Sequence, residues 1–187
     1  MSAPYTVAVL VGSLRKAAFS RKMALAAEAL APGSLKCQIV EIGDLALYNE
    51  DVEAAGAPAS WTAFRTAMKS AQAVLFVTPE YNRSVPGALK NAIDVGSRPY
   101  GQSVFSGKPG AIISVSPGAM GGFGANHHLR QSLVFLDVPV LSQPEAYIGG
   151  AAALFDEAGA ITNPGTRDFV TKFMAAFADW VEKHAKS

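Results

Sequence analysis

The chain has 187 residues, of which half are hydrophobic and 17% are charged, a composition typical of a folded rather than a disordered chain. It carries 16 lysines and arginines against 15 aspartates and glutamates, and this net charge of +1 speaks against nucleic acid as a partner, because duplex binding needs a concentrated basic surface. A chain of this length buries about 70% of its surface, and we expect a single domain over residues 1–187.

Short β-branched runs alternate along the chain with longer segments of helical spacing, which is the pattern of repeated β-α units. In chain order, the predicted strands cover residues 6–11, 37–42, 73–78, 111–115 and 138–142. The predicted helices cover residues 20–31, 61–71, a segment from Pro86 onward, 124–136 and 166–183. The stretches 46–60 and 150–165 are rich in Ala, Gly and Pro and are predicted to form surface loops or a short hairpin.

Five strands joined by helices predict an α/β fold, a three-layer sandwich in which helices cover both faces of a parallel sheet with right-handed crossovers. The run 73–78 is apolar on both faces, as expected of a central parallel strand. Ligands in such sheets bind outside the carboxyl ends of the strands, where the winding direction reverses. The loops that follow the first, third and fourth strands are therefore the expected functional site.

A single cysteine, Cys37, excludes an internal disulfide, an iron–sulfur site and a cysteine-based zinc site. We expect it to be a buried apolar residue in a reducing, cytoplasmic setting. The longest apolar runs have the length of strands and fall far short of the roughly 18–20 residues of a bilayer span, so no membrane partner is expected. A strand-like run begins by residue 6 with no basic region before it, which predicts the absence of a signal peptide.

The first loop runs from Gly12 to Ser20 and leads into a helix, whose free N–H groups and positive dipole end favour an anion. Ser13 and Ser20 add hydroxyl donors, and Arg15 adds a forked cation suited to phosphate. The loop lacks both G-x-G-x-x-G and G-x-x-x-x-G-K-[ST], so the phosphate of a mononucleotide is predicted rather than a dinucleotide pyrophosphate. The alternative is that Ser20 only caps the helix and Arg15 is a solvated surface charge.

The second loop, Thr-Pro-Glu-Tyr-Asn-Arg-Ser-Val-Pro-Gly over residues 78–87, presents main-chain donors and acceptors over a short arc. Such a loop can hold the edge of a flat heterocycle, with Tyr81 against its face. The alternative is a plain strand-to-helix connection in which Asn82 and Pro86 are turn and helix-start signals. The loop at 116–122 is similarly turn-rich, and together the three loops predict a flat ring beside an anchored phosphate.

Several segments resemble the NADPH-dependent FMN reductase family, especially its chromate and quinone reductase branch: residues 12–16, 79–94 and 97–99, and then 121–122, 128–131 and 144–145. The resemblance implies a flavodoxin-like fold with sheet order 2-1-3-4-5, bound FMN, and a homodimer or homotetramer. By this resemblance the phosphate is held by Ser13, Arg15 and Ser20. The full set of implied cofactor-binding residues is Ser13, Leu14, Arg15, Phe19, Ser20, Pro79, Glu80, Tyr81, Asn82, Arg83 and Ser116.

The sequence departs from the family pattern at two places. After Lys16 the family commonly has Gly-Ser-Phe-Asn, whereas this chain has Ala-Ala-Phe-Ser, which removes one hydroxyl and bears on FMN affinity. Gly124, His127 and Val95 stand where relatives often have Arg, an aromatic residue and Trp. In relatives that Arg and aromatic residue join the equivalent of Glu145 in contacts between subunits, so these departures favour the dimer over the tetramer.

The resemblance implies an enzyme in which NADPH or NADH gives hydride to FMN and an acceptor such as a quinone or chromate takes two electrons. The flavin carries the chemistry, so no catalytic side chain and no metal are expected, and Arg15 and Arg83 are candidates for a positive potential near the ring. The main alternative is a non-enzymatic flavodoxin-like electron carrier, which would not oxidise NADPH directly. A response-receiver domain lacks its acidic cluster here, and a flavin-free nucleoside-processing enzyme with Glu80 as nucleophile is the remaining alternative.

Overall fold

The structure is a computed structural model that describes residues 3–185. Its centre is a sheet of five parallel strands in the order β2-β1-β3-β4-β5. The strands are β1 Tyr5–Val11, β2 Leu35–Ile39, β3 Ala73–Thr78, β4 Gly110–Val115 and β5 Ala146–Ile148. This is the predicted doubly wound α/β fold with the predicted strand order.

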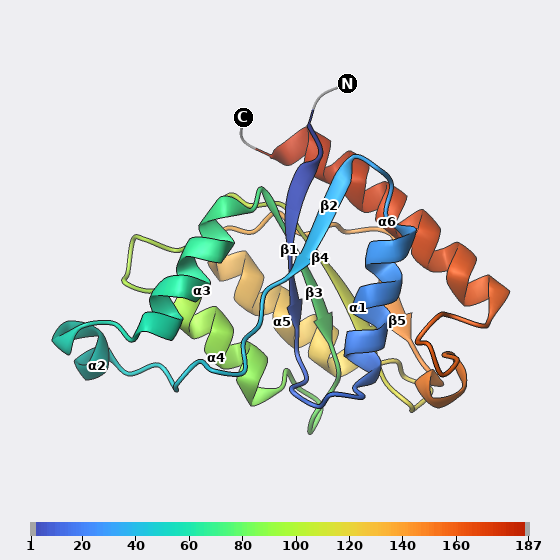
Figure 1. The fold of residues 1–187 in the computed structure, drawn as a ribbon, viewed down its shortest axis with the longest axis horizontal. Helices are drawn as coiled ribbons and strands as arrows, with labels where there is room; N and C mark the ends of the chain where they lie inside the picture. The colour runs from blue at the N-terminus through green and yellow to red at the C-terminus, as the bar shows by residue number, and fades with distance from the viewer. Residues whose placement is uncertain (1–2, 186–187) are drawn as a thin grey trace.

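The helices form a layer on each side of the sheet (Figure 1). One layer is α1 Phe19–Leu30 and α6 Pro164–His184, and the other is α3 Ala59–Ser70, α4 Gly87–Gly96 and α5 Phe123–Phe135. Each layer has its own apolar core, because β1, β3 and β4 project alternate side chains to the two faces. Every residue of β3 and β4 is buried, which explains why both strands are apolar apart from Thr78 and Ser114.

The predicted fifth strand at 138–142 is wrong. There Val140 forms only an isolated bridge with Gly110, whereas β5 pairs with the end of β4 through Ile113, Ser114 and Val115. Pro139 has no N–H to donate, and Pro144 interrupts the chain again, so a regular ladder begins only beyond the second proline.

Smaller differences between the prediction and the structure concern the end of β2 and two connecting segments. β2 ends at Ile39 rather than residue 42, because its pairing follows β1 and the chain leaves the sheet after residue 40. The stretch predicted as an irregular loop at 46–60 contains the short helix α2 Glu50–Ala55. Asn49 caps this helix by accepting a hydrogen bond from the Asp51 N–H at 2.8 Å. The stretch 150–165 holds a 3-10 turn, Ala151–Ala153, and a short hairpin bridge between Phe155 and Ile161, as the hairpin prediction allowed.

The topology positions the site. The chain leaves β1 toward β2 on one side and returns to β3 on the other, so the loops at the carboxyl ends of β1 and β3 diverge and open a crevice. These loops lie together at the lower edge of the sheet in Figure 1. Among residues 3–185, no helix is both long and apolar enough to cross a membrane.

Candidate functional site

A cavity of about 240 Å³ lies at the carboxyl ends of β1, β3 and β4, where the three predicted loops meet. It brings together the following predicted residues: Ser13, Arg15, Phe19, Ser20, Pro79, Glu80, Tyr81 and Ser116. Ala18, Val115 and Pro117 also line it and were not among the predicted cofactor-binding residues, although Ala18 belongs to the departure from the family pattern after Lys16. They are adjacent to predicted cofactor-binding residues in the same three loops, and this adjacency could have identified them from the sequence.

The first wall of the cavity is the β1–α1 loop, which passes close to β3. Gly12 donates its N–H to the Val77 carbonyl at 2.9 Å, and a Cβ at this position would lie 3.0 Å from both Pro79 Cδ and Thr78 Oγ1. Glycine therefore allows this close approach of the two loops. The helix that follows begins after Ala18, which has no side-chain capping group, so the first N–H groups of α1 lack a side-chain acceptor.

Ser20 is the clearest sign of a ligand in this cavity. Its side chain is buried to 1% exposure, and its Oγ is the single buried side-chain polar atom without a hydrogen-bond partner in the part of the chain that the structure describes. The interpretation of Ser20 as a helix cap is wrong, because the N-cap position is Ala18. An unpaired buried hydroxyl is costly, so a hydroxyl that faces a cavity is suited to a ligand that completes its hydrogen bonding.

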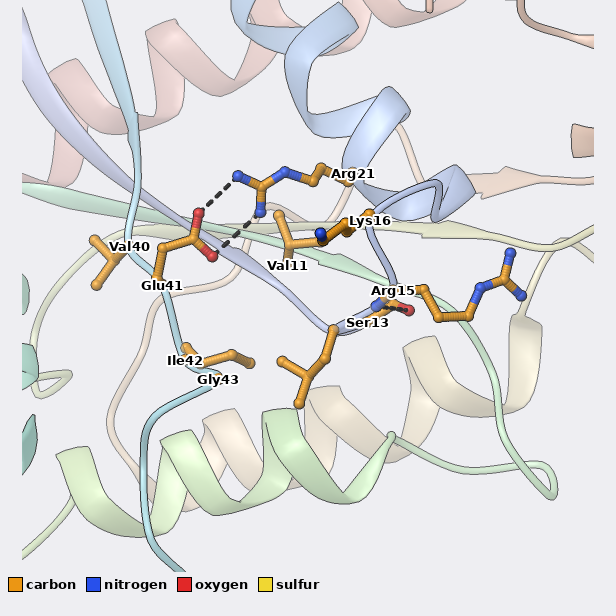
Figure 2. Close-up of a pocket in the computed structure, with 10 residues that line it drawn as sticks. Val11, Ser13, Arg15, Lys16, Arg21, Val40, Glu41, Ile42 and Gly43 are labelled. Carbon is orange, nitrogen blue, oxygen red and sulfur yellow. Dashed lines mark hydrogen bonds and ion pairs between the residues drawn. The ribbon is translucent and has the colours of Figure 1, made fainter.

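A second cavity, of about 380 Å³, lies on the other side of the β1–α1 loop and shares Ser13 and Arg15 with the first (Figure 2). Leu14 lines this second cavity and not the first. A forked ion pair between Arg21 and Glu41 closes one side, with N–O distances of 2.6 and 3.2 Å. The hydrogen bond from Arg21 lowers the pKa of the Glu41 carboxyl below its usual value.

Arg15 and Lys16 are exposed, and neither forms an ion pair within residues 3–185. The guanidinium of Arg15 extends away from the Arg21–Glu41 pair in Figure 2. The loop therefore presents two uncompensated cations beside an uncapped helix start, which is an arrangement that attracts anions.

The second wall of the cavity is the β3–α4 loop, which folds back on itself. Tyr81 and Ser84 exchange two backbone hydrogen bonds, of 3.1 and 2.9 Å, and close a two-residue turn. Asn82 and Arg83 form the tip in the left-handed conformation, with φ of 50° and 63°. Neither residue lines the cavity, and their place beside the flavin ring, which the family resemblance implies, stays a prediction.

The third wall is the loop after β4. Ser116 donates its N–H to the Ile148 carbonyl at 2.9 Å, and its Oγ accepts the Gly118 N–H at 3.1 Å. On the opposite wall, Phe19 packs against Phe155 with ring centroids 6.4 Å apart. The cavity thus combines a cationic end with walls that carry apolar and main-chain polar groups.

Other side chains with potential chemistry have structural partners. His127 Nε2 lies 3.0 Å from Tyr147 Oη, and His128 Nδ1 lies 2.9 Å from Ser84 Oγ. Cys37 is buried, as expected, and burial raises the pKa of its thiol to about 11. No group of three or more His, Cys, Asp or Glu side chains that could hold a metal ion occurs within the described residues.

Comparison with known proteins points to one family. The model of the NADPH-dependent FMN reductase family matches residues 5–153. The chain is 65% identical to a quinone reductase from Pseudomonas putida, over 97% of each chain, and 45% identical to a 2-hydroxy-1,4-benzoquinone reductase from a Burkholderia species, over 94% of this chain and 95% of that one. Among solved structures, it superimposes on FerB, a flavoenzyme NAD(P)H:(acceptor) oxidoreductase from Paracoccus denitrificans, with a TM-score of 0.92, 43% identity and coverage of 97% and 100%.

Proposed function

The chain belongs to the NADPH-dependent FMN reductase family, and on this basis we propose how its residues hold the flavin and which acceptors it reduces. It is an FMN-dependent oxidoreductase that uses NAD(P)H as the electron donor. The enzymatic interpretation is favoured over a non-enzymatic carrier, because the family model and the relatives similar over the whole chain are reductases.

The residues of the cavity fit FMN, and the observation that carries this fit is the unpaired buried hydroxyl of Ser20. We assign the phosphate to Ser13, Arg15, Ser20 and the uncapped start of α1. A phosphate oxygen can accept the hydrogen bond that Ser20 lacks within the protein, and the charge of Arg15 favours the dianion. We assign the ring to the two other walls, formed by residues 79–81 and 115–117.

When bound, FMN supplies the redox chemistry, accepting hydride from NAD(P)H and passing two electrons to the acceptor. The protein's own residues bind the cofactor, orient it and shield it from water. Phe19 and Val115 contribute apolar surface to the cavity, and Tyr81, with 52% of its surface exposed, lies where the cavity meets solvent. Arg15 and Arg83 add positive potential near an entering anionic donor or acceptor, and no side chain is required as an acid or base.

Quinones are the acceptors that we propose first. The support is the printed activity of the similar proteins, a quinone reductase and a 2-hydroxy-1,4-benzoquinone reductase. Chromate is a further proposed acceptor, because it is a small dianion and two exposed cations lie nearby, Arg15 at this cavity and Lys16 at the adjoining second cavity.

Absorption spectroscopy tests the proposed function. The purified protein, supplied with FMN if it is colourless, is expected to show an oxidised-flavin spectrum that bleaches on anaerobic addition of NADPH. Addition of a benzoquinone is then expected to restore the oxidised spectrum, and chromate to do so more slowly. Flavin that stays oxidised with both NADPH and NADH would contradict the proposal, and so would a protein that binds no FMN.

We also propose that the enzyme assembles as a homodimer or homotetramer. Large apolar side chains are exposed at the carboxyl end of α5 and in the α4–β4 loop, which line a common cavity: Val134 at 77%, Phe135 at 74% and Tyr100 at 83%. A cavity of about 350 Å³ between α4 and α5 includes Phe135. Light scattering coupled to size exclusion checks the assembly, and Phe135→Glu is expected to shift the protein toward the monomer.

We place the enzyme in the cytoplasm. The donor NAD(P)H is an intracellular metabolite, and the single cysteine is what a reducing compartment predicts. Fractionation of the native host should recover the protein and its NAD(P)H-dependent quinone reduction in the cytoplasmic fraction, and recovery in the external medium would contradict this placement.

A further inference from the structure

The tip of the β3–α4 loop has a backbone conformation that its sequence alone does not favour. A two-residue turn whose central residues are both left-handed prefers glycine and asparagine, because a Cβ is disfavoured in that region. Asn82 suits such a turn, but Arg83, with φ of 63°, does not. Contacts from outside the loop must therefore stabilise this shape.

Helix α5 supplies these contacts from both sides of the turn. Before the turn, Glu80 Oε2 accepts the N–H of Ala125 at 3.0 Å. After the turn, Ser84 Oγ lies 2.9 Å from His128 Nδ1. The Glu80 carboxylate sits at the first turn of α5, where N–H groups lack intrahelical acceptors and the helix dipole favours negative charge.

Gly124 completes the junction between the loop and α5. A Cβ at this position would lie 2.7 Å from the Arg83 carbonyl oxygen and 3.0 Å from Glu80 Oε2. The backbone of Gly124 is not left-handed, so glycine is required here by space and not by φ. The start of α5 thus forms a surface against which the tip of the loop is seated.

We propose that the first two turns of α5 set the conformation of the flavin-binding loop 79–84, with Glu80, Gly124 and His128 as positioning residues. This inference rests on the proposed assignment of the loop to the FMN ring. Although Glu80 lines the cavity, the inference attributes its effect on FMN binding to the hydrogen bond from the Ala125 N–H, which holds the loop in place. Because Gly124 and His128 do not line the cavity, changes there reach the flavin only by moving the loop.

The first test replaces Gly124 and measures the flavin directly. In Gly124→Ala the added methyl must displace the Arg83 carbonyl, and we expect FMN affinity to fall about 5- to 150-fold, the range to which the usual cost of overpacking converts. The dissociation constant is read from the fluorescence of FMN released on dilution of the holoenzyme, and a shifted flavin absorption spectrum is expected with it. Gly87→Ala is the matched control, because it adds a methyl to the first turn of α4 with no atom within 4 Å.

The second test separates positioning from direct contact at Glu80. Glu80→Gln retains an oxygen that can accept the Ala125 N–H, whereas Glu80→Ala does not. We expect Glu80→Ala to lose protection of the Ala125 amide against hydrogen exchange and to weaken FMN binding, and Glu80→Gln to restore both. Hydrogen exchange is measured by NMR on the full-length chain with and without FMN.

Two results would overturn the inference. One is wild-type FMN affinity and spectrum in Gly124→Ala. The other is Glu80→Gln that protects the Ala125 amide and yet binds FMN as weakly as Glu80→Ala, since this would assign Glu80 to direct flavin contact. If the wild-type chain itself binds no FMN, the proposed function fails, while amide exchange in the flavin-free chain still reports whether Glu80 links the loop to α5.

Discussion

The β1–α1 loop and the β3–α4 loop form two walls of the same cavity, but their polar groups are satisfied in different ways. In the β1–α1 loop, Ser20 Oγ is buried without a partner and Arg15 has no ion pair among residues 3–185, and α1 starts without a side-chain cap. In the β3–α4 loop, Ser84 and Glu80 have partners on α5, and the turn closes its own backbone hydrogen bonds. Groups of the first loop are thus available to a ligand, whereas those of the second maintain its shape.

This difference separates two kinds of mutational effect. Where a polar group is reserved for a ligand, its removal weakens binding but relieves the ligand-free protein of an unpaired group. Where a polar group already has a partner, its removal destabilises the protein whether or not the ligand is bound. Measurement of FMN affinity and of ligand-free stability on the same variant therefore distinguishes the two loops.

The largest expected effect is that of Arg15→Ala on FMN affinity. A charged hydrogen bond to phosphate contributes about 1.5–3 kcal/mol, so we expect the dissociation constant for FMN to rise roughly 10- to 150-fold, measured by flavin fluorescence. Lys16→Ala is the control, because Lys16 is adjacent and cationic but lines only the second cavity. Equal losses of FMN affinity in the two variants would mean that the positive charge of the loop, rather than the forked geometry of Arg15, holds the phosphate.

The next effect contrasts two serines, one in each loop. Ser20→Ala is expected to stabilise the FMN-free chain by about 1 kcal/mol and at the same time to weaken FMN binding. Ser84→Ala is expected to destabilise the FMN-free chain by about 0.5 kcal/mol, because it removes the hydrogen bond to His128, an exposed side chain that water can then solvate. Urea unfolding of the FMN-free variants measures both signs, and a destabilising Ser20→Ala would show that Ser20 has a structural role in the absence of flavin.

The sequence alone predicted those features of the two loops and their strands that depend on local sequence pattern. Apolar β-branched runs located β1, β3 and β4, and the two glycine- and proline-marked loops were placed at the correct edge of the sheet. The sequence-based prediction of β5 was wrong, because the position of this strand depends on its long-range pairing with β4. Pro139 and Pro144 interrupt the chain before β5, so the regular ladder begins only after the second proline.

The contacts between the β3–α4 loop and α5 also could not be predicted from the sequence. Glu80 and Ala125 are 45 positions apart, and no short motif predicts that a carboxylate will accept a hydrogen bond from a particular N–H on a helix three elements later. Asn82 and Arg83 form a left-handed turn and do not line this cavity, and their position beside the ring, which the family resemblance implies, stays a prediction. Such contacts follow from the packing of α4 and α5 on the same face of the sheet.

A smaller effect is expected of Arg83→Ala. Because Arg83 lies at the tip of the loop and off the cavity wall, its loss should leave FMN affinity unchanged while raising the KM for NADPH or chromate about two- to fivefold, as loss of an exposed steering charge does. The increase should shrink at high salt, where exposed charges are screened. Unchanged steady-state kinetics at low ionic strength would remove Arg83 from the binding of anionic substrates.

The smallest effect concerns the Arg21–Glu41 pair, which closes the second cavity behind the β1–α1 loop. The hydrogen bond from Arg21 lowers the pKa of Glu41 in the folded protein below its ordinary value of 4.5, so the pair contributes stability above that pH and loses it as the pH falls through the folded pKa. Because Glu41 is largely exposed, its contribution at neutral pH should be only about 0.2–1 kcal/mol. The free energies of unfolding of the wild type and Glu41→Gln should therefore differ at pH 7 and converge toward pH 3. A constant difference over that range would show that the pair acts through packing at the loop rather than through charge.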